Sequence, residues 1–206
     1  MTDGVIRVTS PVLPPANERE VLRYMGVTGS ADGSVLELMH AALVESAPVW
    51  TPRVCSREIL IRREGDLLGI GTAQVHSVSL SKALCGCERA VLFAATVGLG
   101  IDRLIAAYSR TSPARAVCLQ AVGAERIEAL CDAFCKGLSE EYAGQGVTLR
   151  PRFSPGYGDL PLELQADIFK LLDCQHQIGL TLNDSMLMSP SKSVTAIVGL
   201  KERETI

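Results

Sequence analysis

One ten-residue segment constrains the fold more than any other part of this chain. Residues 150–159 read Arg-Pro-Arg-Phe-Ser-Pro-Gly-Tyr-Gly-Asp. Each proline fixes φ and removes a backbone N–H, so neither a regular helix nor a central strand forms across this segment. Each glycine lets the chain turn or lets another molecule approach the backbone closely. The backbone groups here therefore need partners outside a regular ladder, supplied by protein, water or a ligand.

A second irregular segment lies further along the chain. Residues 188–194 read Met-Ser-Pro-Ser-Lys-Ser-Val, and the proline again interrupts regular pairing. We predict that these two loops face each other across one cleft and that the rest of the chain forms its walls.

The size and charge of the chain limit its class. Its 206 residues predict a single domain over 1–206, with a lead-in and helices in 1–50 and the sheet and groove core in 51–200. A net charge of −3 argues against a general nucleic-acid binder. No apolar run is long enough to span a membrane, and the N-terminus lacks the pattern of a secretion signal. We expect a cytoplasmic protein.

Hydrophobic periodicity and cap residues predict helices and strands in irregular alternation. The lead-in, residues 1–17, is predicted to be extended. The predicted helices are 18–26, 35–46 with His40 on its inner side, 79–84 capped by Ser79, 101–110, 113–142, and one beginning at 159–161. The predicted strands are 54–63 and 67–74, which form a hairpin, 91–96, 179–182 and 193–200. Because no regular βαβ rhythm appears, we predict an α+β fold with a mainly antiparallel sheet.

The longest predicted helix carries two contrasting faces. It begins at Ser112 and Pro113, and its core face is marked by apolar residues at helical spacing: Ile127, Leu130, Phe134 and Leu138. Another face carries an acidic row formed by Glu125, Glu128 and Asp132. We favour a solvated surface for this row.

Seven cysteines leave two readings open. An odd count in a chain expected in the cytoplasm favours structural thiols over a disulfide framework. The alternative is metal or redox chemistry at Cys85 and Cys87, or at Cys131 and Cys135, which lie one helical turn apart. The sequence contains no phosphate loop, dinucleotide fingerprint, Gly-x-Ser-x-Gly elbow or paired-His metal motif. It therefore predicts neither a hydrolase nor a P-loop enzyme.

The two irregular loops carry a family resemblance. The run Arg152-Phe-Ser-Pro-Gly-Tyr157, followed by Asp184-Ser-Met-Leu-Met188-Ser-Pro-Ser-Lys-Ser-Val194, resembles the activation domain of cobalamin-dependent methionine synthase, also in its free-standing form. Further matches are Leu92-Phe-Ala-Ala-Thr-Val-Gly98 and Ser154-Pro-Gly-Tyr-Gly-Asp159. The resemblance covers about half of the chain and implies a mainly antiparallel, curved sheet flanked by helices.

The resemblance also implies a function. Family members bind S-adenosylmethionine in a shallow groove and present its methyl group to a cobalamin carried by another domain, which restores oxidised cobalt to the catalytic cycle. The implied partners are a corrinoid-binding domain or a truncated methionine synthase, together with a flavodoxin-type electron donor. On this reading the chain is a stand-alone reactivation subunit.

Site residues follow from the matched motifs. The resemblance assigns Arg152 to the ligand carboxylate, and Pro155, Gly156 and Tyr157 to the adenine and ribose. A helical glutamate of the family that meets the ligand amine aligns with Ala129, one position from Glu128, and an aromatic of the last strand aligns near Val198. Beyond Tyr157, the family's Pro-Ala-Cys-Pro-Asp-His continuation is replaced by Gly-Asp-Leu-Pro.

Each assignment has a structural alternative. Arg152 could simply form a salt bridge with Asp159 or Glu163 and have no ligand role, and Tyr157 could be a core residue. The chain as a whole could be a non-catalytic docking module on the same fold. A thiol or metal protein is the remaining alternative.

Overall fold

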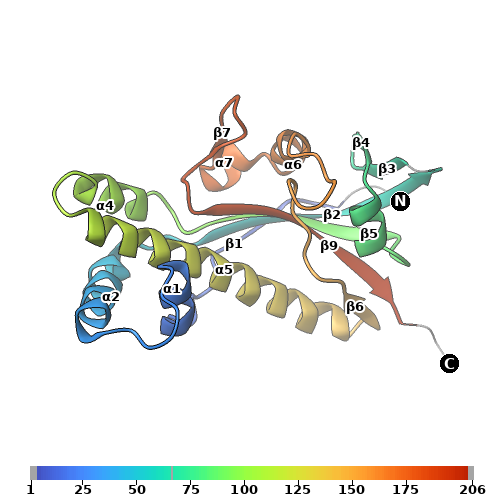
Figure 1. The fold of residues 1–206 in the computed structure, drawn as a ribbon. Coiled ribbons are helices and arrows are strands. Elements are labelled where there is room, and N and C mark those ends of the chain that lie inside the picture. Colours follow the sequence, from blue (N-terminus) through green and yellow to red (C-terminus); the bar gives the residue numbers. More distant parts are fainter. Residues whose placement is uncertain (1–3, 66, 204–206) are drawn as a thin grey trace.

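The computed structural model describes residues 4–65 and 67–203 (Figure 1). Its main sheet has the strand order β4-β3-β2-β5-β9-β6, with β1 also paired to β2, and every pairing in it is antiparallel. The strands are β1 (Arg7–Thr9), β2 (Arg53–Glu64), β3 (Leu67–Ile70), β4 (Ala73–His76), β5 (Arg89–Thr96), β6 (Val147–Leu149), β9 (Ser193–Glu202), and the separate hairpin β7 (Thr181–Leu182) with β8 (Met188–Ser189). The predicted α+β class with an antiparallel sheet is confirmed.

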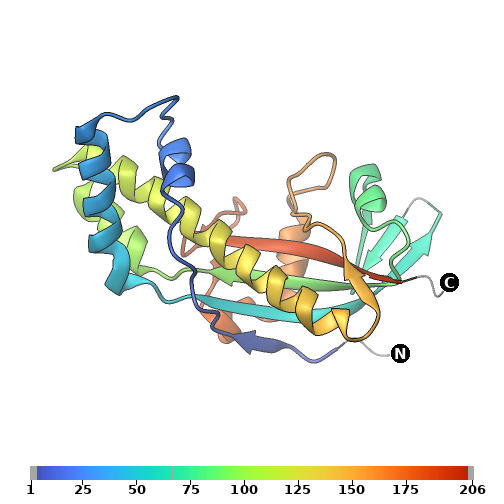
Figure 2. The same cartoon turned by 90° about the horizontal axis from the view of Figure 1, so that it is seen from below.

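Helices cover both faces of the sheet. They are α1 (Glu18–Tyr24), α2 (Gly33–Ser46), the short 3-10 helix η1 (Ala47–Val49), α3 (Val78–Ala83), α4 (Gly100–Tyr108), α5 (Pro113–Ala143), α6 (Leu164–Leu172) and α7 (Cys174–Ile178). Helix α5 lies along one face, and α6 and α7 lie on the other (Figures 1 and 2). Helices α1, α2 and α4 pack against the first half of α5 at one end of the sheet.

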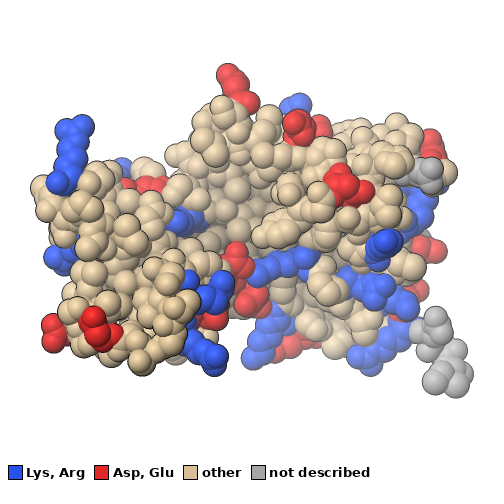
Figure 3. Space-filling model, in the orientation of Figure 1, with Lys and Arg blue, Asp and Glu red and all other residues tan. Residues whose placement is uncertain are grey.

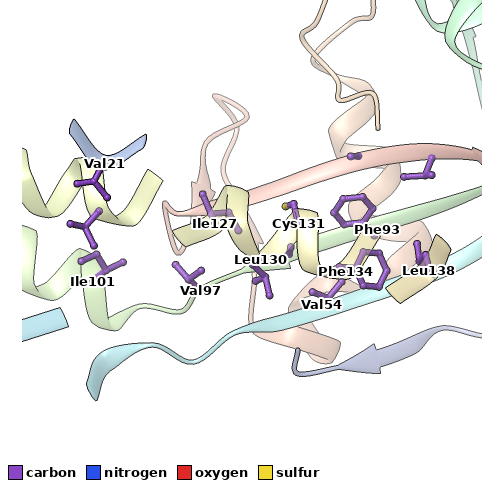
Figure 4. Packing of buried hydrophobic residues seen from close by; sticks show 14 of the residues in the cluster. Val21, Val54, Phe93, Val97, Ile101, Ile127, Leu130, Cys131, Phe134 and Leu138 are labelled. Carbon is purple, nitrogen blue, oxygen red and sulfur yellow. The ribbon is translucent and has the colours of Figure 1, made fainter. Parts of the chain in front are cut away.

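The central strand β5 divides the core into two layers. Val91, Phe93 and Ala95 face α5, whereas Leu92 and Ala94 face α6. Both sets are buried because helices cover both faces, which is why the strand reads as one continuous apolar run. Figure 4 shows the α5 layer, in which the rings of Phe93 and Phe134 lie 4.9 Å apart.

The periodicity of α5 predicted its core face correctly. Ile127, Leu130, Phe134 and Leu138 are all buried against the sheet. The helix begins at Pro113, as predicted, although the Ser112 side chain makes no capping hydrogen bond. The first half of this 31-residue helix lies among α1, α2 and α4, and its second half runs along the sheet (Figure 2).

The predicted extended lead-in contains the strand β1, which pairs with the outer edge of β2. Two local predictions were wrong. The stretch 67–74 is two strands, since the chain reverses after Ile70 at Gly71, whose φ is +59°. His40 is exposed and pairs with Glu18, because the buried side of α2 is formed by its neighbours Met39 and Ala42.

The cap of α3 was also misplaced. Helix α3 begins one residue earlier than predicted, and Ser77 rather than Ser79 accepts the capping bond from Leu80 N. None of the helices in residues 4–65 and 67–203 combines the length and apolarity needed to cross a bilayer.

Candidate functional site

The two irregular loops line one cavity, as the sequence predicted. Its volume is about 380 Å³, within the range of small-molecule sites. Its lining comes from α5, the 152–157 segment, α6 and the 188–195 segment: Glu128, Arg152, Phe153, Ser154, Pro155, Tyr157, Gln165, Met188, Ser193, Val194 and Thr195. Figure 3 shows a hollow over the first residues of β9, with acidic and basic side chains along its lower border.

The cavity forms where the first loop separates from β9. Arg150 and Phe153 still bond to β9, through Gly199 O and Ile197 respectively. Beyond Phe153 the chain turns away, and Pro155 has no N–H with which to continue the pairing. The outer edge of β9 at 193–195 therefore faces the cavity instead of another strand.

The far end of the loop is clamped onto α3. The Asp159 carboxylate accepts hydrogen bonds from Ser77 Oγ at 2.6 Å, Val78 N at 2.7 Å and Ser79 N at 3.0 Å. The bond from Ser77 and those from the two backbone amides lower the pKa of Asp159. Gly158 has φ +58°, and a Cβ there would lie 2.6 Å from Ser79 Oγ. The Gly-Asp continuation thus fastens the loop to α3.

Arg152 is held by α5 on one side only. Its Nη2 lies 2.6 Å from Glu128 Oε2 and 3.1 Å from Asp132 Oδ1. Its Nη1 is buried and has no hydrogen-bond partner within the described chain. A buried donor without a partner costs free energy, so this nitrogen requires an explanation.

Carboxylates dominate the electrostatics around Arg152. Burial lowers the pKa of Arg152, yet the net direction is upward because Cys131, Glu128 and Asp132 lie close to it. Burial also raises the pKa of Cys131, so that thiol is protonated at neutral pH. The two carboxylates are therefore the charged partners of this guanidinium.

The cavity has a charged end and an uncharged end on opposite faces of the sheet. Glu128 comes from α5, and Val194 packs into the core layer beneath that helix. Phe153 and Met188 pack into the layer beneath α6, where Thr195 Oγ1 reaches Gln165 Oε1 at 3.4 Å. The site can therefore hold a ligand with an ionic group at one end and an apolar or neutral polar group at the other.

The structure brings most of the predicted site residues together. Arg152, Pro155, Tyr157 and Glu128 line the cavity, and Gly156 sits in the same turn with φ +88°. Val198 does not reach the cavity. It is 1% exposed, lies in the core beneath α5 and pairs with Val91, because β9 side chains alternate between faces.

Several structural alternatives were wrong. Arg152 pairs with Glu128 and Asp132 rather than with Asp159 or Glu163. Tyr157 is 68% exposed and is not a core residue. The acidic row is not simply solvated, because Glu125 is 4% exposed and pairs with Arg126.

Sequence reasoning missed Gln165. It lies on α6 beside the buried residues Leu164 and Ile168, and it is itself 4% exposed. The signal available was a polar residue within an apolar helical stripe. Asp132 was noticed in the sequence, but its proximity to Arg152 depends on tertiary packing.

Larger cavities lie elsewhere on the described part of the molecule, and two of them border β1 or α5. One of about 610 Å³ lies beside β1 and β2, and one of about 690 Å³ lies between the 12–17 segment and α5. Glu128 borders the second of these as well, and Ala129 lines only that one. Neither is lined by residues of the two loops.

The seven cysteines do not gather in one cluster. Cys131 is fully buried in the core, and Cys55 and Cys174 approach each other with sulfur atoms 4.0 Å apart. Among residues 4–65 and 67–203, no three His, Cys, Asp or Glu side chains are arranged to hold a metal ion.

The fold and the cavity define an α+β domain with a loop-lined cavity at the edge of an antiparallel sheet. The sequence model of the family described as "Vitamin B12 dependent methionine synthase, activation domain" matches residues 84–204, more than half of the chain. The chain belongs to this family.

A solved structure supports the same fold. The crystal structure of the MetH reactivation domain bound to AdoHcy superposes with a TM-score of 0.66 at 16% sequence identity, covering 98% of this chain and 80% of that chain. At this identity the likeness establishes the fold alone. The comparison with curated proteins gave no match.

Proposed function

We propose that this chain binds S-adenosylmethionine in the loop-lined cavity and supports reductive methylation of oxidised cobalamin on a partner protein. The observation that carries this proposal is the buried Nη1 of Arg152, which has no partner among residues 4–65 and 67–203 and belongs to a residue that lines a cavity formed by both family loops. A ligand carboxylate is a natural partner for that nitrogen, because arginine forms strong charge-assisted bonds to carboxylates.

The remaining contacts follow from the polarity of the cavity. Glu128, bonded to Arg152 through one carboxylate oxygen, lies where it can accept a hydrogen bond from the ligand's ammonium. Pro155, Gly156 and Tyr157 form the turn that meets the adenosyl half, and Gly156 permits close approach of that group to the backbone. The ionic and nucleoside halves of the ligand then match the charged and uncharged ends of the cavity.

The chemistry resides in the ligands. The sulfonium supplies a methyl group and leaves as S-adenosylhomocysteine, while an external reductant, such as a flavodoxin-type protein, supplies one electron. This chain binds and orients, and the methyl transfer needs no general base. We propose that it works in the cytoplasm as a stand-alone subunit, on a corrinoid-binding domain or a truncated methionine synthase.

Isothermal titration with S-adenosylmethionine tests the binding step. We expect saturable binding with one site per chain, and loss of that binding in Arg152→Met. Absence of heat up to millimolar ligand, with and without a corrinoid protein, would refute the proposal.

A second candidate is a docking module that binds without delivering a methyl group. It is favoured by Val198, which lies in the core and adds no contact to the cavity. Incubation with a reductant, S-adenosylmethionine and an oxidised corrinoid protein separates the two candidates. Appearance of the methylated corrinoid spectrum excludes the docking-only function.

A further inference from the structure

Gln165 is a buried amide in an otherwise apolar helical stripe. It is 4% exposed and lines the cavity, between Leu164 and Ile168 of α6. Burying an amide is unfavourable unless it is hydrogen-bonded, and an apolar side chain would fill this position without that cost. Its presence at the uncharged end of the cavity therefore indicates that hydrogen bonds of this amide are needed there.

The orientation of this amide is fixed by its neighbours. Gln165 Nε2 donates to Met186 O at 2.9 Å, and a carbonyl can only accept, so the NH₂ side must face Met186. Met186 adopts φ +61°, a left-handed conformation that is unfavourable for a residue with a side chain. The turn is held by Asn183 Oδ1, which accepts from Ser185 N and Leu187 N.

Two hydrogen-bonding positions of the amide have no partner among the residues that the structure describes. Oε1 accepts one bond, from Thr195 Oγ1, and has capacity for a second. Nε2 has a second N–H beyond the one given to Met186 O. One donor and one acceptor on the same planar group can bind a partner that presents an acceptor and a donor side by side.

The surroundings favour a planar heterocycle as that partner. Phe153, Pro155, Tyr157 and Met188 line the same cavity and supply apolar and aromatic surface for a ring. A glutamine amide matches a 6-aminopurine, since Oε1 accepts from the exocyclic amine while Nε2 donates to a ring nitrogen.

We propose that Gln165 is a specificity-determining residue that recognises the 6-aminopurine edge of the bound ligand. This inference rests on the proposed function and adds a selectivity to it. A 6-oxopurine would place a carbonyl oxygen against Gln165 Oε1, and the Met186 and Thr195 contacts prevent the amide from turning over to accommodate it.

A comparison of the affinities of two ligands tests the inference. Dissociation constants for S-adenosylhomocysteine and its 6-oxo analogue, S-inosylhomocysteine, are measured by titration calorimetry with the wild type and with Gln165→Met. We expect the wild type to prefer the 6-amino ligand by about 10- to 100-fold, and the variant to bind both ligands with similar affinity. Gln175→Met, on an exposed position of α7, is the matched control and should keep the wild-type preference.

The ratio of the two affinities separates recognition from a structural role. A purely structural Gln165 would weaken both ligands equally on substitution and leave the ratio unchanged, which would overturn the inference. If Gln165→Met does not fold, Gln165→Asn withdraws the amide by one methylene and should likewise lose the preference. A wild type that binds both ligands equally refutes the inference but leaves the proposed function standing. A wild type that binds neither refutes both.

Discussion

Two arginines that pair with glutamates of α5 differ in how completely their nitrogens are hydrogen-bonded. Arg126 is 5% exposed and bonds to both oxygens of Glu125, including Nη2 to Oε1 at 2.7 Å. Its Nη1 donates to Pro14 O at 2.6 Å and its Nη2 to Pro15 O at 3.2 Å. Arg152 comes from the 150–159 loop and bonds to Glu128 and Asp132 of α5, but its Nη1 has no partner in the described chain.

The difference teaches how to separate a structural ion pair from a candidate binding site. Both arginines meet a glutamate of the same helix, so residue type alone does not distinguish them. Every nitrogen of Arg126 is satisfied by the fold, and the pair anchors the 14–17 segment to α5, with Asn17 N also bonded to Glu125. Arg152 Nη1 has no partner among the described residues, and Arg152 borders a cavity. Arg150 Nε is also buried without a partner there but Arg150 does not line the cavity, so it is the combination of an open donor and a cavity that distinguishes Arg152.

The largest expected effect on stability comes from removing one partner of the buried Arg126–Glu125 pair. Arg126→Met should lower the free energy of unfolding by about 3–5 kcal/mol, because it leaves the Glu125 carboxylate buried without a counter-charge. Denaturant unfolding measures it. The double variant Glu125→Met/Arg126→Met should recover much of the loss, since it removes both charges together. A single-variant loss below about 1 kcal/mol would contradict the structural role.

Arg152→Met should have little effect on stability and a large effect on ligand affinity. Its partners Glu128 and Asp132 have side chains 42% and 75% exposed, so we expect a stability change of only about 0–1 kcal/mol. Affinity for S-adenosylmethionine should fall by about 30-fold or more, since a buried charged contact is worth about 2–5 kcal/mol. Arg115→Met, an arginine paired with Glu45 away from the cavity, is the control for affinity. Equal affinities of Arg152→Met and wild type would remove Arg152 from the site.

A smaller effect tests the clamp that positions the Arg152 loop. Gly158→Ala should destabilise the protein by about 1–3 kcal/mol, because φ is +58° and the new Cβ meets Ser79. Gly26→Ala is the matched control, since Gly26 has φ +79° but no atom within 4 Å of its added Cβ. The excess loss of Gly158→Ala over the control measures the contact with α3. If the two variants lose the same stability, α3 shifts to accommodate the added Cβ and the contact does not constrain the loop.

The smallest effect is a pH dependence of the same clamp. The pKa of Asp159 is lowered in the folded protein, so its contribution to stability is full above the unfolded pKa of about 4 and is lost as pH falls below that value. The difference in unfolding free energy between wild type and Asp159→Asn should be constant from pH 5 to 7 and should narrow below about pH 4. Measuring both proteins from pH 2.5 to 7 checks this. A difference that stays constant down to pH 2.5 would contradict it.

The sequence alone determined the elements whose patterns are local. The 3.6-residue period of α5 defined its core face, and the continuous apolar run of β5 predicted a strand buried on both sides. The prolines and glycines of 150–159 located the segment that leaves the sheet, and two loop motifs gave the family. These features are readable because each depends on residues adjacent along the chain.

Only the tertiary structure decided which residues meet. In the folded protein Arg152 pairs with Glu128, Val198 lies in the core, and Gln165 of α6 lines the cavity. It also distinguished Glu125 from Glu128, three residues apart on one helix: Glu125 forms a buried pair with Arg126, and Glu128 lines the loop cavity. The physical reason is that burial and unsatisfied hydrogen-bonding groups depend on how distant segments pack, and no local pattern encodes that distance.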